Sequence, residues 1–435
     1  MKRGFAGRIW LVLLAVLLLS GCDQIPLPDI LFSPTATLTP PASPEPTQTR
    51  PASPEPAASP SPATVTLRLW LPPEFDPASG TPAGQLLQDR LDEFQNRRPN
   101  IKVETRIKAV DGAGGMINTL STASAAAPLA VPDLIALPRR SIETAVQKGL
   151  LYPFDDLGPL VGADWFEYSR ESILPSQDQY SLPFAGDTLA LLYRPEIVEM
   201  PPDTWDALRQ IQYPLLFPAA SPQAAFTLTQ YLATGGEIED EEGRPKLDEE
   251  NLTGVYIFYQ QASAGEQMPF WLTQYETDDQ IWEAYQDERA PMAAVWLSNY
   301  LLDLPEDTQA AQLPTPDGDP YTLAAGWVWA MPNSDPLRQQ LGTELAVFLS
   351  EAEFLSSWTQ AAGYLPTRED VLEGWNDPAL QALARQFIES AHPFPSPDIL
   401  NVIGPALQET TVDVLKQQDT PSAAAQRAAE QVSNP

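Results

Sequence analysis

Residues 65–107 read VTLRLWLPPEFDPASGTPAGQLLQDRLDEFQNRRPNIKVETRI, and this stretch decides the fold class of the chain. Apolar residues alternate over 65–71 and again, less strictly, from Ile101 to Ile107, which predicts two strands. Between them, leucines and a phenylalanine recur at spacings of four and three residues, so residues 82–96 are expected to form a helix. The order strand, helix, strand is the unit from which parallel sheets are built.

The same alternation continues further along the chain. A short apolar strand is expected over residues 132–137. The next helix is expected to begin after an N-cap at Ser141 and to stop at Gly149. Strands that alternate with helices favour an α/β fold whose sheet is mostly parallel and covered by helices on both faces.

Capping residues and glycines predict later helix boundaries. Thr204 is expected to cap one helix, and Ser221-Pro222 to begin another. A long helical segment is expected to end at Gly363, and residues 405–432 are expected to be helical. The acidic, glycine-containing stretch 237–250 is interpreted as an exposed loop.

The composition excludes several classes of function. The chain has 58 acidic and 25 basic residues, for a formal net charge of −33, so no nucleic-acid partner is expected. It has one cysteine and one histidine, so neither a disulfide framework nor a Cys/His zinc site can form. We therefore expect no metal and no cofactor.

The sequence offers little for catalysis. The single histidine, His392, lies in a proline-containing run that reads as a loop, and no Gly-x-Ser-x-Gly elbow accompanies it. No phosphate-binding glycine motif is present. A pair of carboxylates, as glycoside hydrolysis uses, is the catalytic option that remains open. We expect no catalytic residue and no enzymatic activity.

The N-terminus has the layout of an export signal. Basic residues precede an apolar run from Ile9 to Leu19, which small residues follow up to Cys22. The apolar run is too short to span a bilayer. This segment resembles a bacterial lipoprotein signal. The resemblance implies that residues 1–21 are removed and that Cys22, the only cysteine, carries the lipid.

Residues 22–63 are rich in proline, serine and threonine, and repeat Pro-Ala-Ser-Pro-Glu-Pro at 41–46 and 51–56. Such a segment has little apolar area to bury, which predicts a disordered, partly polyproline II tether. At about 3.1 Å per residue, it could reach on the order of 100 Å when fully extended.

Several phrases, in a particular order, carry a family resemblance. They are PDLI at 132–135, GLLYPF at 149–154, YSLPFAGDTLALLYR at 180–194, PDTWDAL at 202–208, GWVWAM at 326–331 and GYLPTR at 363–368. From about Val65 to its C-terminus, the chain resembles a family 1 extracellular solute-binding protein, the maltose-binding-protein type that serves ABC importers. Lipid anchoring fits the same family.

The resemblance implies a type II periplasmic-binding-protein fold of two α/β lobes that close over a ligand. The implied N-terminal lobe comprises residues 64–185 and about 316–366. The implied C-terminal lobe comprises residues 186–315 and about 367–435. Hinge crossovers are expected near 185–187, 315–321 and 365–370.

The resemblance also implies a set of ligand-binding residues at the cleft. Asp187 stands where sugar-binding relatives place a ligand-contacting acid, and a tryptophan ring can pack on a pyranose. Each tryptophan could equally be a core residue, and Arg368 could serve structure alone. The set is Asp187, Trp327, Trp296, Glu74, Arg140, Trp70, Tyr364 and Arg368.

The sequence departs from the maltose-binding pattern where small or polar contacts are expected. Pro72, Pro73, Phe75 and Pro138 occupy such positions, which puts maltodextrin specificity in doubt. We expect a monomeric receptor at the outer face of the cell membrane that captures a small solute, a carbohydrate first, and passes it to an ABC permease. A surface-anchored carboxylate-pair glycosidase and a ligand receptor for a sensor kinase are the alternatives.

Overall fold

The structure, a computed structural model, describes residues 64–112, 114–160, 162–170 and 178–433. The expected signal peptide, Cys22 and the expected tether lie outside the described residues. No helix among the residues described is both long and apolar enough to cross a membrane.

The opening strand, helix and strand are confirmed as β1 (Val65–Leu71), α2 (Pro82–Arg97) and β2 (Ile101–Ile107). The hydroxyl of Thr81 accepts a hydrogen bond from the backbone N–H of Gly84 and so caps α2. β1 and β2 pair in parallel along their whole length, as the unit requires.

The described strands form one sheet in the order β2-β1-β3-β8-β4-β6-β5, with β7 paired to β4 and β9 paired to β8. The remaining strands are β3 (Leu134–Pro138), β4 (Leu182–Tyr193), β5 (Leu215–Leu216), β6 (Met292–Trp296), β7 (Gln309–Ala311), β8 (Thr322–Ala330) and β9 (Ala391–Pro393). His392, expected in a loop, therefore lies in a short edge strand.

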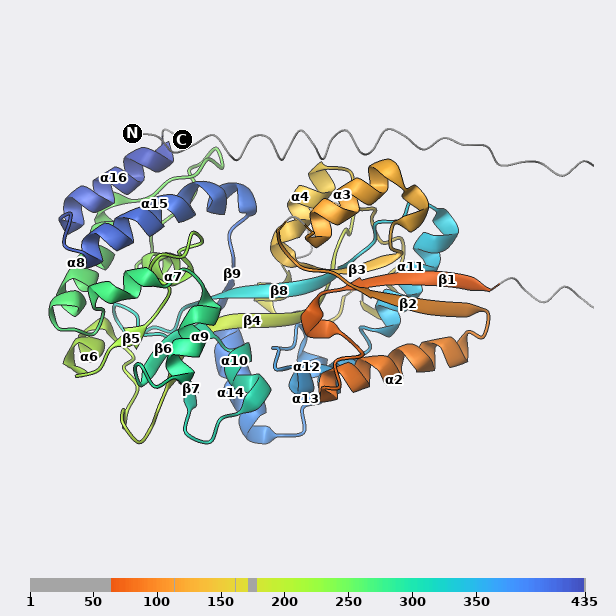
Figure 1. Cartoon of the computed structure of the whole chain (residues 1–435), viewed down its shortest axis with the longest axis horizontal. Coiled ribbons are helices and arrows are strands. Elements are labelled where there is room, and N and C mark those ends of the chain that lie inside the picture. Colours follow the sequence, from red (N-terminus) through yellow and green to blue (C-terminus); the bar gives the residue numbers. More distant parts are fainter. Residues whose placement is uncertain (1–63, 113, 161, 171–177, 434–435) are drawn as a thin grey trace, which may run out of the picture. The chain divides into compact units, whose positions relative to one another are not determined.

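The α/β prediction is confirmed, but the sheet is mixed rather than mostly parallel. β1 runs parallel to β2 and β3, β5 to β6, and β8 to β9. By contrast, β4 runs antiparallel to β6, β7 and β8, and β3 runs antiparallel to β8. The reason is that β4 and β8 are long strands that cross the middle of the sheet in opposite directions (Figure 1).

One end of the sheet is covered by helices on both faces. Leu67 and Leu69 face a core that includes α2 and the helices α11 (Pro336–Phe348) and α12 (Ala352–Ala362). Ile135 and Leu137 face a second core. That second core includes α3 (Met116–Ala126) and α4 (Ile142–Gln147), and Figure 1 shows these helices on the opposite side from α2.

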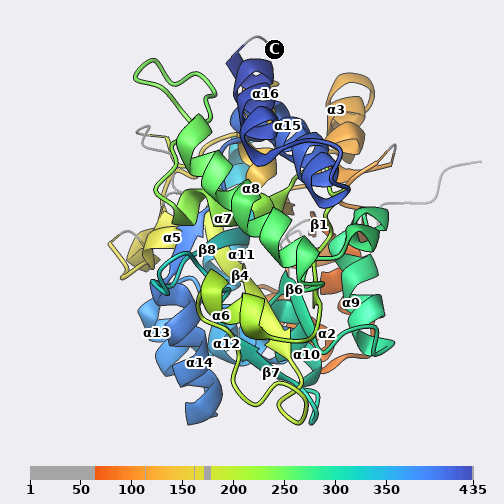
Figure 2. The same ribbon diagram turned by 90° about the vertical axis from the view of Figure 1, so that its left-hand side faces the viewer.

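The other end of the sheet has one large core of its own, to which most of the C-terminal half contributes. Figure 2 shows several of its helices facing the viewer. The helices around this end are α6 (Trp205–Gln210), α7 (Ala225–Ala233), α8 (Glu249–Ala264), α9 (Asp278–Gln286), α10 (Ser298–Asp303), α14 (Pro378–Glu389), α15 (Pro397–Leu415) and α16 (Pro421–Ser433). The short helices α5 (Glu167–Arg170) and α13 (Glu369–Glu373) lie between these regions in sequence. The lobe boundaries stay predictions.

Helix boundaries agree with the sequence at some positions and not at others. The cap at Thr204 is confirmed, and Gly363 ends α12 at a φ of 72°. Ser141 is not an N-cap: its backbone is already helical and its side chain caps nothing. Ser221-Pro222 begins a turn instead of a helix, because Ala224 takes a left-handed conformation before α7 starts. α15 begins eight residues before Pro405, which lies inside the helix.

Candidate functional site

A cleft of about 1680 Å³ opens beside the middle of the sheet, and both ends of the sheet contribute to its walls. It holds most of the residues that the sequence nominated. Those that line it are Glu74, Arg140, Asp187, Trp296, Trp327 and Tyr364. Their role in binding stays a prediction, but their common location agrees with it.

Asp187 and Trp327 lie on the two crossing strands. Asp187 pairs with Ala325 and Trp327 pairs with Ala185, so the two side chains project from the same face of the sheet, two positions apart. Because both strands are paired on each side, their backbones are fixed. This part of the cleft is therefore preformed in the absence of a ligand.

The Asp187 carboxylate is held in place by backbone donors. Its Oδ1 accepts hydrogen bonds from the N–H groups of Thr188 at 2.9 Å and Ser298 at 3.0 Å. The side chain is only 8 % exposed. Burial raises its pKa to about 7, although the hydrogen bonds from Ser298 and Thr188 act in the opposite direction.

The Trp327 ring is supported from behind by other aromatic rings. Phe75 packs edge-on against it with centroids 4.8 Å apart, and contacts Tyr364 at 5.6 Å. Trp327 is half-buried and lines the cleft, so part of its ring remains free for a ligand.

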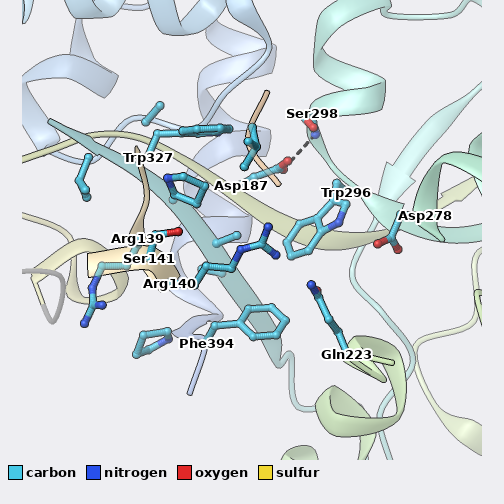
Figure 3. Close-up of a pocket in the computed structure, with 18 of the residues that line it drawn as sticks. Arg139, Arg140, Ser141, Asp187, Gln223, Asp278, Trp296, Ser298, Trp327 and Phe394 are labelled. Carbon is cyan, nitrogen blue, oxygen red and sulfur yellow. Dashed lines mark hydrogen bonds between the residues drawn. The ribbon is translucent and has the colours of Figure 1, made fainter. Parts of the chain in front are cut away.

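Trp296 lies across the cleft, at the end of β6. Its side chain lies near Asp278, and its ring lies 6.0 Å from that of Phe394. Figure 3 shows Arg140 reaching into the same space from the opposite wall. Arg140 pairs with Asp111 at 2.6 Å. The cleft therefore presents aromatic faces beside fixed polar groups.

Two nominated residues need correction. Trp70 is 2 % exposed and packs into the core beside α3 and α4, because alternation on a sheet covered on both faces aims it away from the cleft. Arg368 is 1 % exposed, pairs with Asp370 at 2.9 Å and donates to the Ser350 carbonyl at 3.0 Å. Neither lines the cleft, and Arg368 has a structural role.

The residues that depart from the maltose-binding pattern do not all lie in the same place in the structure. Pro73 and Pro138 line the cleft, whereas Phe75 is buried behind the rings that it supports. Sequence reasoning missed several lining residues, namely Arg139, Gln223, Asp278, Ser298 and Phe394. A signal existed for Asp278, because Thr277 and Gln280 form a capping box that marks the start of α9.

The cleft lacks the residues that a metal would need. Among the residues the structure describes, no group of three or more His, Cys, Asp or Glu side chains could hold a metal ion. The cleft offers aromatic faces, hydrogen-bond donors and acceptors, and carboxylates. Such groups suit the capture of a polar organic molecule.

A family model for bacterial extracellular solute-binding proteins matches residues 89–383, more than half of the chain. The chain belongs to this family. Membership implies a location outside the cytoplasm. Members bind solutes and are not enzymes, which confirms the expectation of capture without catalysis and sets aside the glycosidase alternative.

Individual relatives agree with this assignment. The chain is 24% identical over 361 residues to the maltotriose-binding protein of Pyrococcus abyssi, which covers 76% of this chain and 75% of the relative. The cyclic α-maltosyl-1,6-maltose binding protein of Arthrobacter globiformis has a TM-score of 0.70 at 15% identity, over 85% of this chain and 98% of that one.

The sugar-binding protein MalE of Xanthomonas citri has a TM-score of 0.69 at 19% identity, over 85% of this chain and 96% of that one. At these identities the structures establish the fold alone. They confirm the two-lobed periplasmic-binding-protein architecture that the resemblance implied.

The raised pKa of Asp187 predicts a pH-dependent stability. Between 3.8 and about 7 the folded protein keeps a proton that the unfolded chain has lost, so this group's contribution to stability falls as pH rises through that interval. We expect Asp187→Asn to remove this group's pH dependence from the free energy of unfolding. The change in that free energy is on the order of a few kcal/mol. Urea unfolding at about pH 5 and about pH 8 measures it.

The variant should gain stability relative to the native protein at the higher pH. Tyr168 and Tyr364 keep their protons at both pH values because burial raises their pKa, and Asp278 is present in both proteins. A difference between the two proteins that is the same at both pH values would contradict the burial of a carboxylate with a raised pKa.

Proposed function

We propose that the protein is a lipid-anchored receptor of an ABC importer that captures a sugar or oligosaccharide in the cleft between its lobes. The observation that carries the proposal is the placement of the Trp327 ring and the buried Asp187 carboxylate on one face of the crossing strands. A ring face packs against the C–H groups of a pyranose, and a carboxylate accepts hydroxyl hydrogen bonds.

Binding would couple to lobe closure. Arg140 approaches the cleft from one wall, and Trp296 approaches from the other (Figure 3). A ligand that contacts both is held better when the walls come together, so it shifts the population toward the closed form. The permease would then recognise the closed receptor.

The ligand class draws support from the relatives. The Pyrococcus relative is named for maltotriose and the Arthrobacter structure for a cyclic maltosaccharide. Both names fit a cleft with several aromatic rings. Pro73 and Pro138 in the lining are the reason to extend the proposal to oligosaccharides other than maltodextrins.

The anchor is proposed from the N-terminal sequence. Lipid on Cys22 and the tether at 22–63 would keep the receptor within reach of a permease. A single polypeptide supplies both walls of the cleft, which supports action as a monomer.

A saccharide screen with a tryptophan variant tests the proposed binding. Thermal shift identifies the tightest of a panel of mono- and oligosaccharides, and calorimetry then measures its affinity. We expect Trp327→Ala to weaken binding by about 1–3 kcal/mol, because it removes a stacking face.

Phe270→Ala is the matched control. Phe270 is 63 % exposed and does not line the cleft, so its removal should leave affinity unchanged. Stabilisation by a peptide or an inorganic anion, with none by any saccharide, would contradict the ligand class. A large loss of thermal stability in Trp327→Ala with intact affinity would assign the ring to the core.

Fractionation of cells that express the full chain tests the anchor. We expect the native protein in the membrane fraction and Cys22→Ala in the soluble extracytoplasmic fraction, because the lipid requires the thiol. Ser20→Ala keeps the thiol and serves as the control. Identical fractionation of the native protein and Cys22→Ala would contradict the anchor.

A further inference from the structure

The two walls of the cleft differ in charge balance. On the wall that carries η3 (Arg139–Ser141), Arg139 pairs with Glu143 and Arg140 pairs with Asp111. The other wall presents Asp187 from β4, Glu239 from the loop before α8, and Asp278 and Asp279 from the start of α9. No described lysine or arginine forms an ion pair with any of these four carboxylates.

Of these carboxylates, Asp187 is buried and Asp278 is half-buried. Asp187 is 8 % exposed, and both of its backbone hydrogen bonds from described residues end on Oδ1. Asp278 is half-buried near the Trp296 side chain, and burial raises its pKa, as it does that of Asp187. Uncompensated buried carboxylates are costly unless a cation neutralises them.

An aromatic face lies beside both groups. In Figure 3, the Trp296 ring lies between Asp187 and Asp278, and Phe394 lies further along the same side of the cleft. Indole faces attract cations, most strongly where water is excluded. The indole packs against the Phe394 ring, with centroids 6.0 Å apart. Carboxylates and a ring face together form a site for an ammonium group.

We propose that the ligand is a saccharide that carries a protonated amine, and that its ammonium group binds beside Asp187 against the face of Trp296, with Asp278 on the other side of the ring. The inference rests on the proposed function and narrows its substrate class. The rest of the sugar would pack on Trp327, on the far side of Asp187 in the view of Figure 3.

Arg140 is the residue that argues against a cationic ligand. Its guanidinium reaches toward Trp296 in Figure 3, and it could instead recognise an acidic sugar. It forms an ion pair with Asp111, which belongs to its own wall, at 2.6 Å. Among the described residues, the four carboxylates opposite have no lysine or arginine as an ion-pair partner, so the balance of charge favours a cationic ligand over an anionic one.

Calorimetry on the full chain tests this inference with four probes of equal length. They are the glucosamine trisaccharide, its N-acetylated form, maltotriose and a galacturonate trisaccharide. At about pH 7, where Asp187 is partly ionised and the amines are partly protonated, we expect the glucosamine trisaccharide to bind at least about tenfold more tightly than its N-acetylated form. We also expect that preference to shrink as salt rises.

Variants locate the effect. Asp187→Asn keeps an oxygen for the Thr188 and Ser298 N–H groups, and Asp278→Asn keeps the size of the side chain while removing its charge. Each should reduce the preference for the amine by about tenfold. Asp206→Asn, on the exposed surface of α6 and outside the cleft, removes the same charge and should change nothing. Thermal unfolding curves identify any variant that fails to fold. If one variant fails, the affinity of the other variant tests the proposed location of the ammonium group.

The outcomes separate this inference from the proposed function. Equal or tighter binding of maltotriose or the N-acetylated sugar would overturn the inference and leave the proposed function standing, as would a preference for the galacturonate. A preference for the amine that survives in both folded variants would overturn the proposed location. No binding of any saccharide would overturn the proposed function itself.

Discussion

The antiparallel pairing of β4 with β8 is the constraint on which the rest of the molecule depends. From Leu182 to Thr188, β4 pairs with β8, and from Leu189 onward it pairs with β6 and β7 instead. A third segment joins at the change of partner, where Gly186 and Leu365 exchange backbone hydrogen bonds of 2.8 and 2.7 Å. Only glycine fits there, since a Cβ would lie 2.3 Å from the Tyr168 hydroxyl oxygen.

This constraint also arranges the binding surface. Asp187 and Trp327 lie on the crossing strands, so their positions are set by the sheet. Arg140, Trp296 and Asp278 instead belong to loops or element ends on the two walls. A ligand held between these groups would pull the walls together around a fixed centre. That division between a rigid middle and approaching walls is what a receptor that closes on its ligand requires.

Alternation and helical spacing predicted β1, α2 and β2 because those elements bury one regular pattern of apolar residues. The same reasoning placed Trp70 at the cleft wrongly, because a strand covered on both faces does not reveal which face a large residue joins. Arg368 was predicted to bind ligand from the sequence motif at 363–368, and such a motif carries no information on whether a side chain is buried. Asp278 was missed because acidic residues are common at the start of a helix, so the sequence does not single this one out. Its proximity to Trp296 arises only from the fold.

A distance across the cleft tests the central claim most directly. Spin labels on Lys102→Cys in β2 and Glu283→Cys in α9, in a Cys22→Ala background, report on opposite ends of the sheet from exposed positions. Pulsed electron spin resonance with a saccharide that calorimetry shows to bind should give a shorter and narrower distance distribution than the free protein. An unchanged distribution at saturating ligand would contradict capture by closure of two lobes about the β4–β8 pairing.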